Sequence, residues 1–116
     1  MSDRELLELK LAAKAAGFEF AYKLIPEVQG KRRGPFILKG SRWVQWNPRK
    51  DDADTLQLAA KLLIQIYPDK DEVEIFHMEI GYIVEPTNGD VIDATRRAIV
   101  RAAAEIGRQM NEGEEK

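Results

Sequence analysis

The stretch Trp46-Asn47-Pro48-Arg49-Lys50-Asp51-Asp52-Ala53-Asp54-Thr55-Leu56 marks the point where an aromatic, strand-like segment gives way to an apolar helix. Proline disfavours the helical region at the preceding residue, so the helix begins after Asn47. Asp51 or Asp52 is the expected N-cap, because aspartate side chains accept hydrogen bonds from the free N–H groups of a first helical turn. The stretch therefore predicts a turn followed by a helix over residues 52–63.

The three aspartates of this stretch also raise the question of a metal site. Neighbouring carboxylates suit Mg²⁺ or Ca²⁺, which prefer oxygen ligands. However, the sequence lacks the D-x-[DN]-x-[DN]-G pattern of an EF-hand loop, and acidic side chains are favoured at the positive end of a helix. We interpret Asp51, Asp52 and Asp54 as helix-capping residues and expect neither a metal site nor a cofactor.

Before the junction, by which we mean the stretch from Trp46 to Leu56, the sequence predicts one helix and three short strands. Ser2 and Glu5 form an S-x-x-E capping box for a helix over residues 3–16, and Gly17 is its expected stop. Alternating or β-prone residues place the strands at 18–22, 36–39 and 42–46. The glycine-rich, basic segment 29–35 is expected to be an exposed loop.

After the junction, the sequence predicts further strands and a long final helix. A β-type run at 64–67 precedes two predicted strands at 72–77 and 79–85. Asp90 or Asp93 is expected to cap the last helix, whose apolar residues follow a 3.6-residue period to Met110. Its alanine-rich middle, from Ala98 to Ile106, predicts a close approach to the element that packs against it.

These elements indicate a single α+β domain over residues 1–110 and a disordered tail at 111–116. Helices interrupt the strands too rarely for a doubly wound sheet. We therefore expect a mainly antiparallel sheet of about four to six strands packed with three helices. A chain of 116 residues, 44% of them hydrophobic, is of ordinary size for one domain.

Composition excludes several classes of function. The 18 basic and 20 acidic residues give a net charge of −2, which provides no global attraction to nucleic acid or to an anionic membrane. The absence of cysteine excludes disulfides and thiolate chemistry. The charged N-terminus, Met1 to Glu5, is unlike a signal peptide, and no apolar run approaches the ~20 residues that span a bilayer.

No catalytic arrangement is evident in the sequence, so we expect a protein that is not an enzyme. His77 is the only histidine, and a partly buried strand histidine with a satisfied hydrogen bond is the expected environment. No G-x-S-x-G elbow and no phosphate-binding glycine loop is present. No cleft is evident for the carboxylates on the expected strands, and solvent-facing positions are expected for most of them; they are Glu72, Glu74, Glu79 and Glu85.

Basic and aromatic residues mark the candidate binding site. The segment Lys31-Arg32-Arg33 lies in a glycine-flanked loop, with Trp43 and Trp46 downstream. Trp and Arg dominate the energetics of protein interfaces. In a regular strand the two indoles would point to opposite faces, so we expect one to be partly exposed unless a bulge intervenes.

A nucleic-acid-binding module is the alternative hypothesis, because basic residues beside aromatic ones can hold phosphates and stack bases. This reading uses Arg32, Arg33, Arg97 and Arg101. Glu105 follows Arg101 by four residues and is expected to pair with it, which weakens the alternative. An exposed sheet edge or the alanine-rich helix would also allow a homodimer, so monomer and dimer both stay open.

Three segments of the chain resemble a group of small uncharacterised phage and prophage proteins with a helix-sheet-helix sandwich domain. They are the segment from Trp46 to Leu62, the opening Glu5-Leu6-Leu7-Glu8-Leu9, and the helix from Asp93 to Gly107. The resemblance implies a phage origin, the host cytoplasm and an accessory role. The group has no established catalytic residues, so none is carried over. The resulting hypothesis is a non-enzymatic accessory protein that binds a macromolecular partner such as a host or defence protein.

Overall fold

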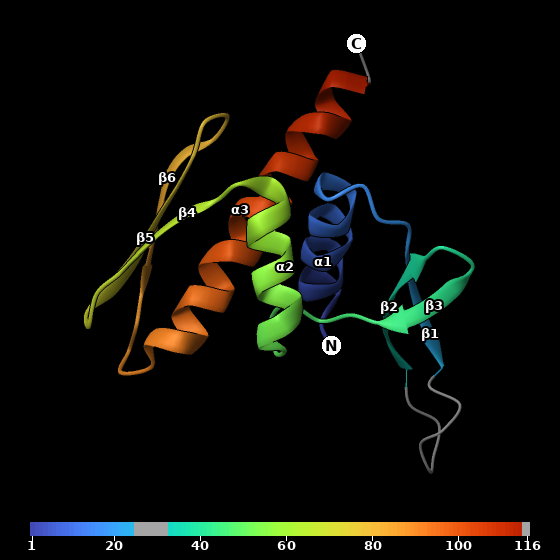
Figure 1. Cartoon of the computed structure of the whole chain (residues 1–116), viewed down its shortest axis with the longest axis horizontal. Helices are drawn as coiled ribbons and strands as arrows, with labels where there is room; N and C mark the ends of the chain where they lie inside the picture. Colours follow the sequence, from blue (N-terminus) through green and yellow to red (C-terminus); the bar gives the residue numbers. More distant parts are fainter. Residues whose placement is uncertain (25–32, 115–116) are drawn as a thin grey trace.

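The computed structural model describes residues 1–24 and 33–114 as three helices and two antiparallel sheets (Figure 1). The first sheet has the order β1-β2-β3 and the second the order β4-β5-β6. In chain order the elements are α1 (Asp3–Ala15), β1 (Phe20–Leu24), β2 (Arg33–Lys39), β3 (Arg42–Gln45), α2 (Asp52–Leu62), β4 (Gln65–Pro68), β5 (Glu72–His77), β6 (Gly81–Pro86) and α3 (Val91–Glu114).

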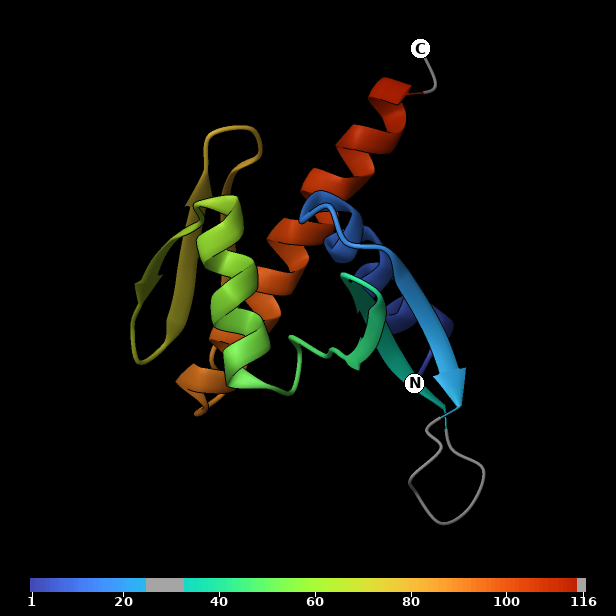
Figure 2. The ribbon, with the colours of Figure 1, turned by 45° about the vertical axis from the view of Figure 1, so that its right-hand side comes forward.

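Helix α3 is the central element of the fold. It packs against α1, α2 and the second sheet, and both views show the two sheets on opposite sides of the helices (Figures 1 and 2). Its apolar stripe supplies a large part of the core, including Ala98, Ile99 and Val100, whose side chains are almost completely buried. The helix therefore brings together segments that are far apart in the sequence.

Helices α1 and α3 approach each other backbone to backbone, as the alanine-rich middle of α3 predicted. Ala12 and Ala13 of α1 and Ala102 and Ala103 of α3 are fully buried. A Cβ atom placed on Gly107 would lie 2.8 Å from the carbonyl carbon of Leu11 and closer still to its oxygen. Only glycine is compatible with this contact at its present spacing.

Each sheet contributes its inner face to the core through a central strand. Ile37 of β2 belongs to the buried core cluster, and its two pairing neighbours, Phe20 and Val44, are partly buried and pack against that cluster. In the second sheet, Ile75 of β5 pairs in the same way with a neighbour on each side, Ile66 and Ile83. Alternate residues of these strands face outward, since side-chain direction has a period of two along a strand.

The predicted α+β class and the three helices are confirmed, but the expectation of one sheet is wrong. The six strands form two separate sheets of three strands each. The helix between β3 and β4, α2, carries the chain from one side of α3 to the other, so strands before and after it do not pair (Figure 1). The hydrophobic pattern identified the strands but carried no information about which of them are neighbours.

The N-cap residues predicted for the three helices are confirmed. The Ser2 hydroxyl accepts a hydrogen bond from the Glu5 N–H, and the Asp51 carboxylate accepts one from the Asp54 N–H. Asp90 caps α3 by accepting from the Asp93 N–H at 2.9 Å. These contacts depend on residues three positions apart, which is why the sequence alone predicts them.

The loop predicted at residues 29–35 is partly wrong. Arg33, Gly34 and Pro35 belong to strand β2, while residues 29–32 lie outside the described part of the chain. Proline lacks an N–H group, but its carbonyl still accepts a hydrogen bond from the Trp46 N–H at 3.0 Å. This long-range contact extends the strand through a segment whose composition suggested a loop.

The disordered tail predicted at residues 111–116 is wrong for residues 111–114, which continue α3. Arg108 forms an ion pair with Glu112, and Lys14 of α1 contacts Glu114 at 2.7 Å. These contacts link the last turns of α3 to the rest of the helix and to α1. Residues 115 and 116 lie outside the described part of the chain.

Replacing Gly107 with alanine should destabilise the protein by about 2–3 kcal/mol, because the new methyl group overlaps the Leu11 carbonyl and forces α1 and α3 apart. For a domain of this size the midpoint of thermal unfolding should fall by roughly 10 °C. Circular dichroism during heating measures the change.

Gly113→Ala is the matched control, since a Cβ at this position of the same helix meets open space. It should leave stability unchanged or raise it by up to about 1 kcal/mol through helix propensity. Equal stability of the two variants would contradict the close backbone contact of α1 and α3.

Candidate functional site

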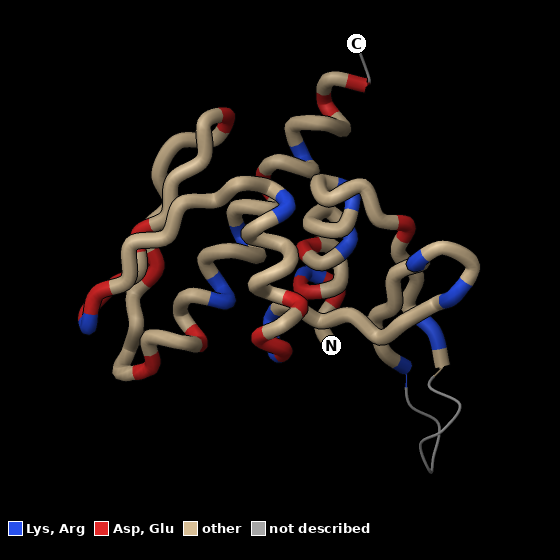
Figure 3. The backbone as a smooth tube through the Cα atoms, viewed as in Figure 1, with Lys and Arg blue, Asp and Glu red and all other residues tan. Residues whose placement is uncertain are grey.

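The first sheet carries only basic charges within its strands. Lys23, Arg33, Lys39 and Arg42 lie on β1, β2 and β3, and no aspartate or glutamate lies on the described residues of these strands. The acidic residue nearest to them in the sequence, Glu19, precedes β1. Figure 3 shows the resulting cluster of blue segments on one side of the molecule. We call β1–β3 with these four residues the basic sheet.

Trp43 is one of the partly exposed aromatic residues of the basic sheet, together with Phe20 and Tyr22. Its indole is partly exposed, and the Lys23 ammonium lies 4.0 Å from its ring centroid. A cation over an indole face is a favourable arrangement, and it stabilises this orientation of both side chains. Trp43 and Lys23 therefore form an ordered pair on the sheet face opposite to Ile37.

Trp46 is a core residue and not part of an exposed site. It is only 2% exposed, and the rings of Phe18 and Phe20 approach it edge-on with centroids 6.0 and 6.3 Å away. The expectation that one of the two indoles is partly exposed is confirmed by Trp43. The candidate site loses Trp46 as a contact residue, while Lys31 and Arg32 lie outside the described residues.

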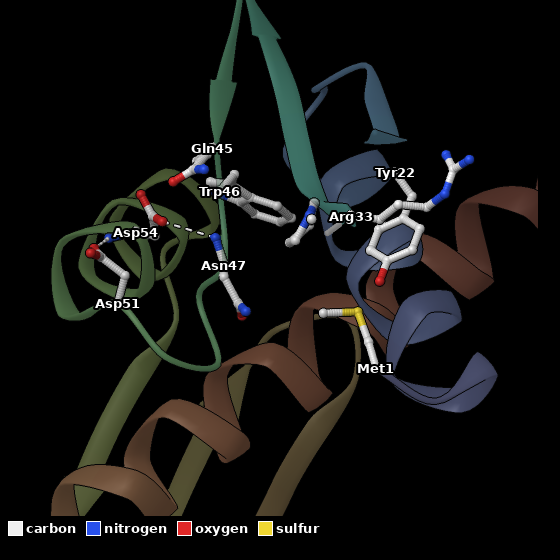
Figure 4. A pocket seen from close by; sticks show the side chains of 10 residues that line it. Met1, Tyr22, Arg33, Gln45, Trp46, Asn47, Asp51 and Asp54 are labelled. Carbon is white, nitrogen blue, oxygen red and sulfur yellow. Dashed lines mark hydrogen bonds between the residues drawn. The ribbon is translucent and has the colours of Figure 1, made fainter. Parts of the chain in front are cut away.

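A pocket of about 710 Å³ lies between the basic sheet and the start of α2 (Figure 4). Polar side chains from both sides face it, with Arg33 and Tyr22 on one side and Asp51 and Asp54 on the other. Trp46 forms part of its wall. The lining residues are Met1, Tyr22, Arg33, Gly34, Pro35, Gln45, Trp46, Asn47, Asp51 and Asp54.

The aspartates of the junction have structural partners. Asp51 caps α2, and Asp54 accepts a hydrogen bond from the Asn47 N–H at 2.9 Å. Asp52 forms an ion pair with Arg96 of α3 at 2.5 Å. Within residues 1–24 and 33–114, no group of three or more histidine or acidic side chains is arranged to hold a metal ion.

The pKa of Asp54 is raised above its ordinary value of 3.8, chiefly because partial burial disfavours the charged form. The hydrogen bond from Asn47 opposes this shift, and the neighbouring charge of Asp51 reinforces it.

The arginines of the nucleic-acid alternative are held in ion pairs. Glu85 of β6 binds Arg97 at 3.3 Å and Arg101 at 3.1 Å, and Arg97 also pairs with Asp93. Arg97 additionally donates to the Pro86 carbonyl at 2.8 Å. These contacts fasten α3 to β6 and reduce the positive charge that α3 can offer to phosphates.

The predicted pairing of Arg101 with Glu105 is wrong. Glu105 pairs with Arg108, which lies three residues further along the helix, and the guanidinium lowers the pKa of this carboxyl. Arg101 reaches Glu85 because β6 lies beside α3. The i,i+4 spacing suggested only Arg101 as the partner of Glu105, and it carried no information about Glu85, the competing carboxylate on another element.

A second polar groove of about 470 Å³ runs between the start of α1, α3 and β6. Arg49 contributes to it and contacts Glu8 of α1 at 3.3 Å. Its Nε atom is buried and has no hydrogen-bond partner among the described residues. Arg49 was assigned no role from the sequence, because its partners lie on distant elements.

The second sheet has the opposite charge. The segment from Gln65 to Pro86 contains one basic residue, Lys70. It contains five acidic residues in addition to Glu85, which is paired with arginines of α3. Four of these five are exposed, and Glu74 is partly exposed. The five are Asp69, Asp71, Glu72, Glu74 and Glu79. We call β4–β6 with these five residues the acidic sheet (Figure 3).

His77 has the environment expected for it. The side chain is partly buried at the end of β5, and its Nδ1 atom accepts a hydrogen bond from the Glu79 N–H at 3.1 Å. The contact orders the tight turn between β5 and β6. It gives the histidine a structural role.

No model of a known protein family, no curated protein and no solved structure matches the chain. None of the helices formed by the described residues is both long and apolar enough to cross a membrane. The geometry and charge of the surfaces described above are therefore the basis for a functional proposal.

The raised pKa of Asp54 should appear in the pH dependence of stability. The folded state holds the Asp54 proton more tightly than the unfolded chain does, so protonation of Asp54 stabilises the folded state. This stabilisation is complete below pH 3.8 and is lost as the pH rises through the raised pKa. Asp54→Asn removes the titration but keeps an oxygen that can accept the Asn47 N–H.

Urea unfolding of both proteins between pH 3 and pH 7 measures this effect. The free energy of unfolding of the wild type, relative to that of Asp54→Asn, should decrease with rising pH and then level off. Subtracting the variant cancels the other carboxyl groups. A difference that stays constant over the whole range would show that Asp54 titrates normally.

Proposed function

We propose that this protein acts by binding a macromolecular partner that presents an acidic surface to the basic sheet. The observation that carries this proposal is the segregation of charge on a chain whose net charge is only −2. The described residues of β1–β3 include four basic residues and no acidic residue. Such a local field steers an oppositely charged partner and selects against others.

Arg33 and Arg42 are the residues best placed to meet the partner. Both side chains are exposed, and neither forms an ion pair with any residue in the described ranges. Arg33 lies at the start of β2, and Arg42 lies at the opposite end of the sheet beside the Gly40-Ser41 turn. By the strand register both side chains belong to the face of Ile37, opposite Trp43, so a partner that contacts all three residues reaches around the edge of the sheet.

Trp43 supplies the apolar part of the proposed contact. Tryptophan is frequent among the few residues that carry most of the energy of an interface. The Lys23 ammonium above its ring reduces the mobility of the indole in the free protein, so less side-chain entropy is lost on binding. An acidic partner would gain from this pair both apolar contact and charge neutralisation.

A protein is favoured over a nucleic acid as the partner. Arg97 and Arg101 are paired with Glu85, and the basic sheet offers one partly exposed indole as a stacking platform. Nucleic acid is kept as the alternative partner because Lys23 and Trp43 combine charge and stacking in one place.

The resemblance of the chain to small phage proteins extends this proposal to a biological setting. We place the protein among phage or prophage accessory proteins that act in the host cytoplasm on a host or defence protein. The proposed activity is binding and not catalysis, because Asp51, Asp52 and Asp54 each have a partner that explains their position.

Reversing the charge of the basic sheet should abolish capture of the partner. In an affinity pull-down from host-cell lysate at about 150 mM NaCl, the double variant Arg33→Glu, Arg42→Glu should retain less than a tenth of the partner that the wild type captures. Trp43→Ala should weaken binding by about 2 kcal/mol, or roughly 30-fold. Quantitative mass spectrometry measures both effects.

Lys10→Glu, Lys50→Glu is the matched control, since both lysines are exposed, lie outside the basic sheet and change the net charge by the same amount. This control should capture the partner as the wild type does. Full capture by the Arg33, Arg42 variant would place the binding surface elsewhere.

The nucleic-acid alternative predicts a distinct salt dependence. Fluorescence anisotropy with labelled 20-nucleotide single-stranded and duplex DNA should show a Kd weaker than about 100 μM at 150 mM NaCl, since most basic residues of α3 are paired. A tighter complex whose affinity falls steeply with salt and is lost in Arg33→Glu, Arg42→Glu would favour nucleic acid as the partner.

A further inference from the structure

Strand β6 forms one edge of the acidic sheet, and it pairs only with β5 among the described strands (Figure 1). Just beyond the end of β6, the Thr87 N–H donates to the Asp71 carbonyl at 3.0 Å, in register with the β5–β6 ladder. Hydrogen-bonded and non-hydrogen-bonded pairs alternate along an antiparallel ladder. Counting back from Thr87, the residues whose backbone groups bond to β5 are therefore Glu85, Ile83 and Gly81.

The backbone groups of Tyr82, Val84 and Pro86 consequently point away from β5, to the free edge of the sheet. The Pro86 carbonyl agrees with this assignment, because it accepts a hydrogen bond from the Arg97 side chain at 2.8 Å. The Phe76 and Tyr82 rings agree as well, with centroids 4.9 Å apart, since side chains approach most closely in a non-hydrogen-bonded pair. Proline has no N–H group, so the donors that this edge can offer are the N–H groups of Tyr82 and Val84.

The other three edge strands of the described structure carry features that oppose pairing. Natural sheets protect their edges with charged side chains, with proline or with very short edge strands. β1 carries Lys23, β3 carries Arg42, and β4 has four residues and ends at Pro68. β6 has six residues, and its one charged residue, Glu85, is held by arginines of α3. The edge of β6 is therefore the one best suited to accept another strand.

The free edge of β6 is complementary to itself. In an antiparallel pair of two β6 strands with Ile83 opposite Ile83 of the second copy, Tyr82 of each copy lies opposite Val84 of the other. Each of these two pairs exchanges two backbone hydrogen bonds. All four N–H groups that the two edges offer thereby gain an acceptor, and the carbonyls of the same two residues supply it.

Other registers are less favourable. A shift by two residues in one direction requires the Pro86 carbonyl, which already accepts a hydrogen bond from Arg97. A shift by two residues in the other direction involves the turn at 78–80, where the Ile80 N–H donates to the His77 carbonyl. A shift by one residue places the outer face of one strand beside the inner face of the other.

The side chains favour the register centred on Ile83. Tyr82 is 64% exposed and Val84 is 46% exposed, and both lie on the outer face of the sheet, opposite to the partly buried Ile83. An aromatic residue opposite a β-branched one is a favourable cross-strand pair. On the inner face, Glu85 lies opposite Gly81 of the second copy and not opposite another carboxylate. The contact therefore needs no charge complementarity.

We propose that two copies of the chain associate through their β6 edges as a symmetric dimer with one six-stranded sheet. The same surface of both copies meets, so the contact closes on itself as a two-fold dimer. The alanine-rich middle of α3, the other route to a homodimer that the sequence left open, is buried against α1. No residue of the basic sheet takes part, so the dimer is independent of the proposed binding to an acidic partner.

The length of β6 limits the strength of the dimer. A strand of six residues is about 20 Å long. Pairing of two such edges falls in the class of small interfaces that bury less than about 1,200 Å² in total, which is typical of transient complexes. We expect a dissociation constant between about 10 μM and 1 mM.

Sedimentation velocity of the full chain measures this association. The weight-average sedimentation coefficient should rise toward the value of a dimer as the protein concentration increases from about 10 μM to about 1 mM. A wild type that stays monomeric at 1 mM would overturn the proposal. Assembly beyond a dimer would also overturn it, because the two-fold contact occupies the β6 edge of both copies.

Val84→Pro removes one donor of the free edge and leaves the pairing of β6 with β5 intact, because the Val84 N–H points away from β5. It should raise the dissociation constant of the dimer at least tenfold. Val84→Ile is the matched control, since it keeps the N–H group and a β-branched side chain, and it should dimerise like the wild type. Circular dichroism during heating shows whether both variants are folded. Wild-type affinity in a folded Val84→Pro protein would contradict the β6 contact.

Amide hydrogen exchange of the wild type, followed by NMR, locates the contact without any substitution. At about 10 μM protein, the amides of Tyr82 and Val84 should exchange rapidly, whereas those of Ile83 and Glu85, which bond to β5, should be protected. At about 1 mM, exchange at Tyr82 and Val84 should slow several-fold, in proportion to the ratio of total to monomeric protein. Association without this added protection would place the dimer contact elsewhere and reject the proposal.

Discussion

The close contact between α1 and α3 is the constraint on which the rest of the structure depends. Gly107 meets the backbone of Leu11, and alanines on both helices let the two backbones lie together. No cysteine is available to hold the chain, so the stability of this helix pair comes from tight packing and burial. Helix α2 and the second sheet assemble around α3, while the first sheet packs beside α1.

The helices that hold the core together also keep the two sheets apart. Each sheet covers a different side, so their inner faces belong to one core while their outer faces point in opposite directions (Figure 2). The ion pairs of α3 with Glu85 and Asp52 fix this arrangement at the surface. The basic and the acidic sheet are thereby held apart within one molecule. The charged residues of each sheet therefore stay available to partners.

Much of the local structure could be predicted from the sequence, whereas most of the candidate site could not. Caps such as Ser2, Asp51 and Asp90 act over three residues. The basic loop, Trp43 and Trp46 were identified by residue type, but burial of Trp46 depends on Phe18 and Phe20 from another part of the chain. Arg101 pairs with Glu85 and not with Glu105 of its own helix, because β6 lies beside α3.

By itself the sequence determined the helices, the approximate strands, the capping role of Asp51 and the close approach of the alanine-rich helix, whereas the partners of Asp52 and Asp54 came from the fold. These features depend on side-chain periodicity, backbone preferences and contacts within one helical turn. Tertiary structure alone decided the division into two sheets, the continuation of α3 to Glu114 and the separation of basic from acidic surface. Contacts between distant segments determine these features, and they form only when the helices pack and place each sheet on its own side.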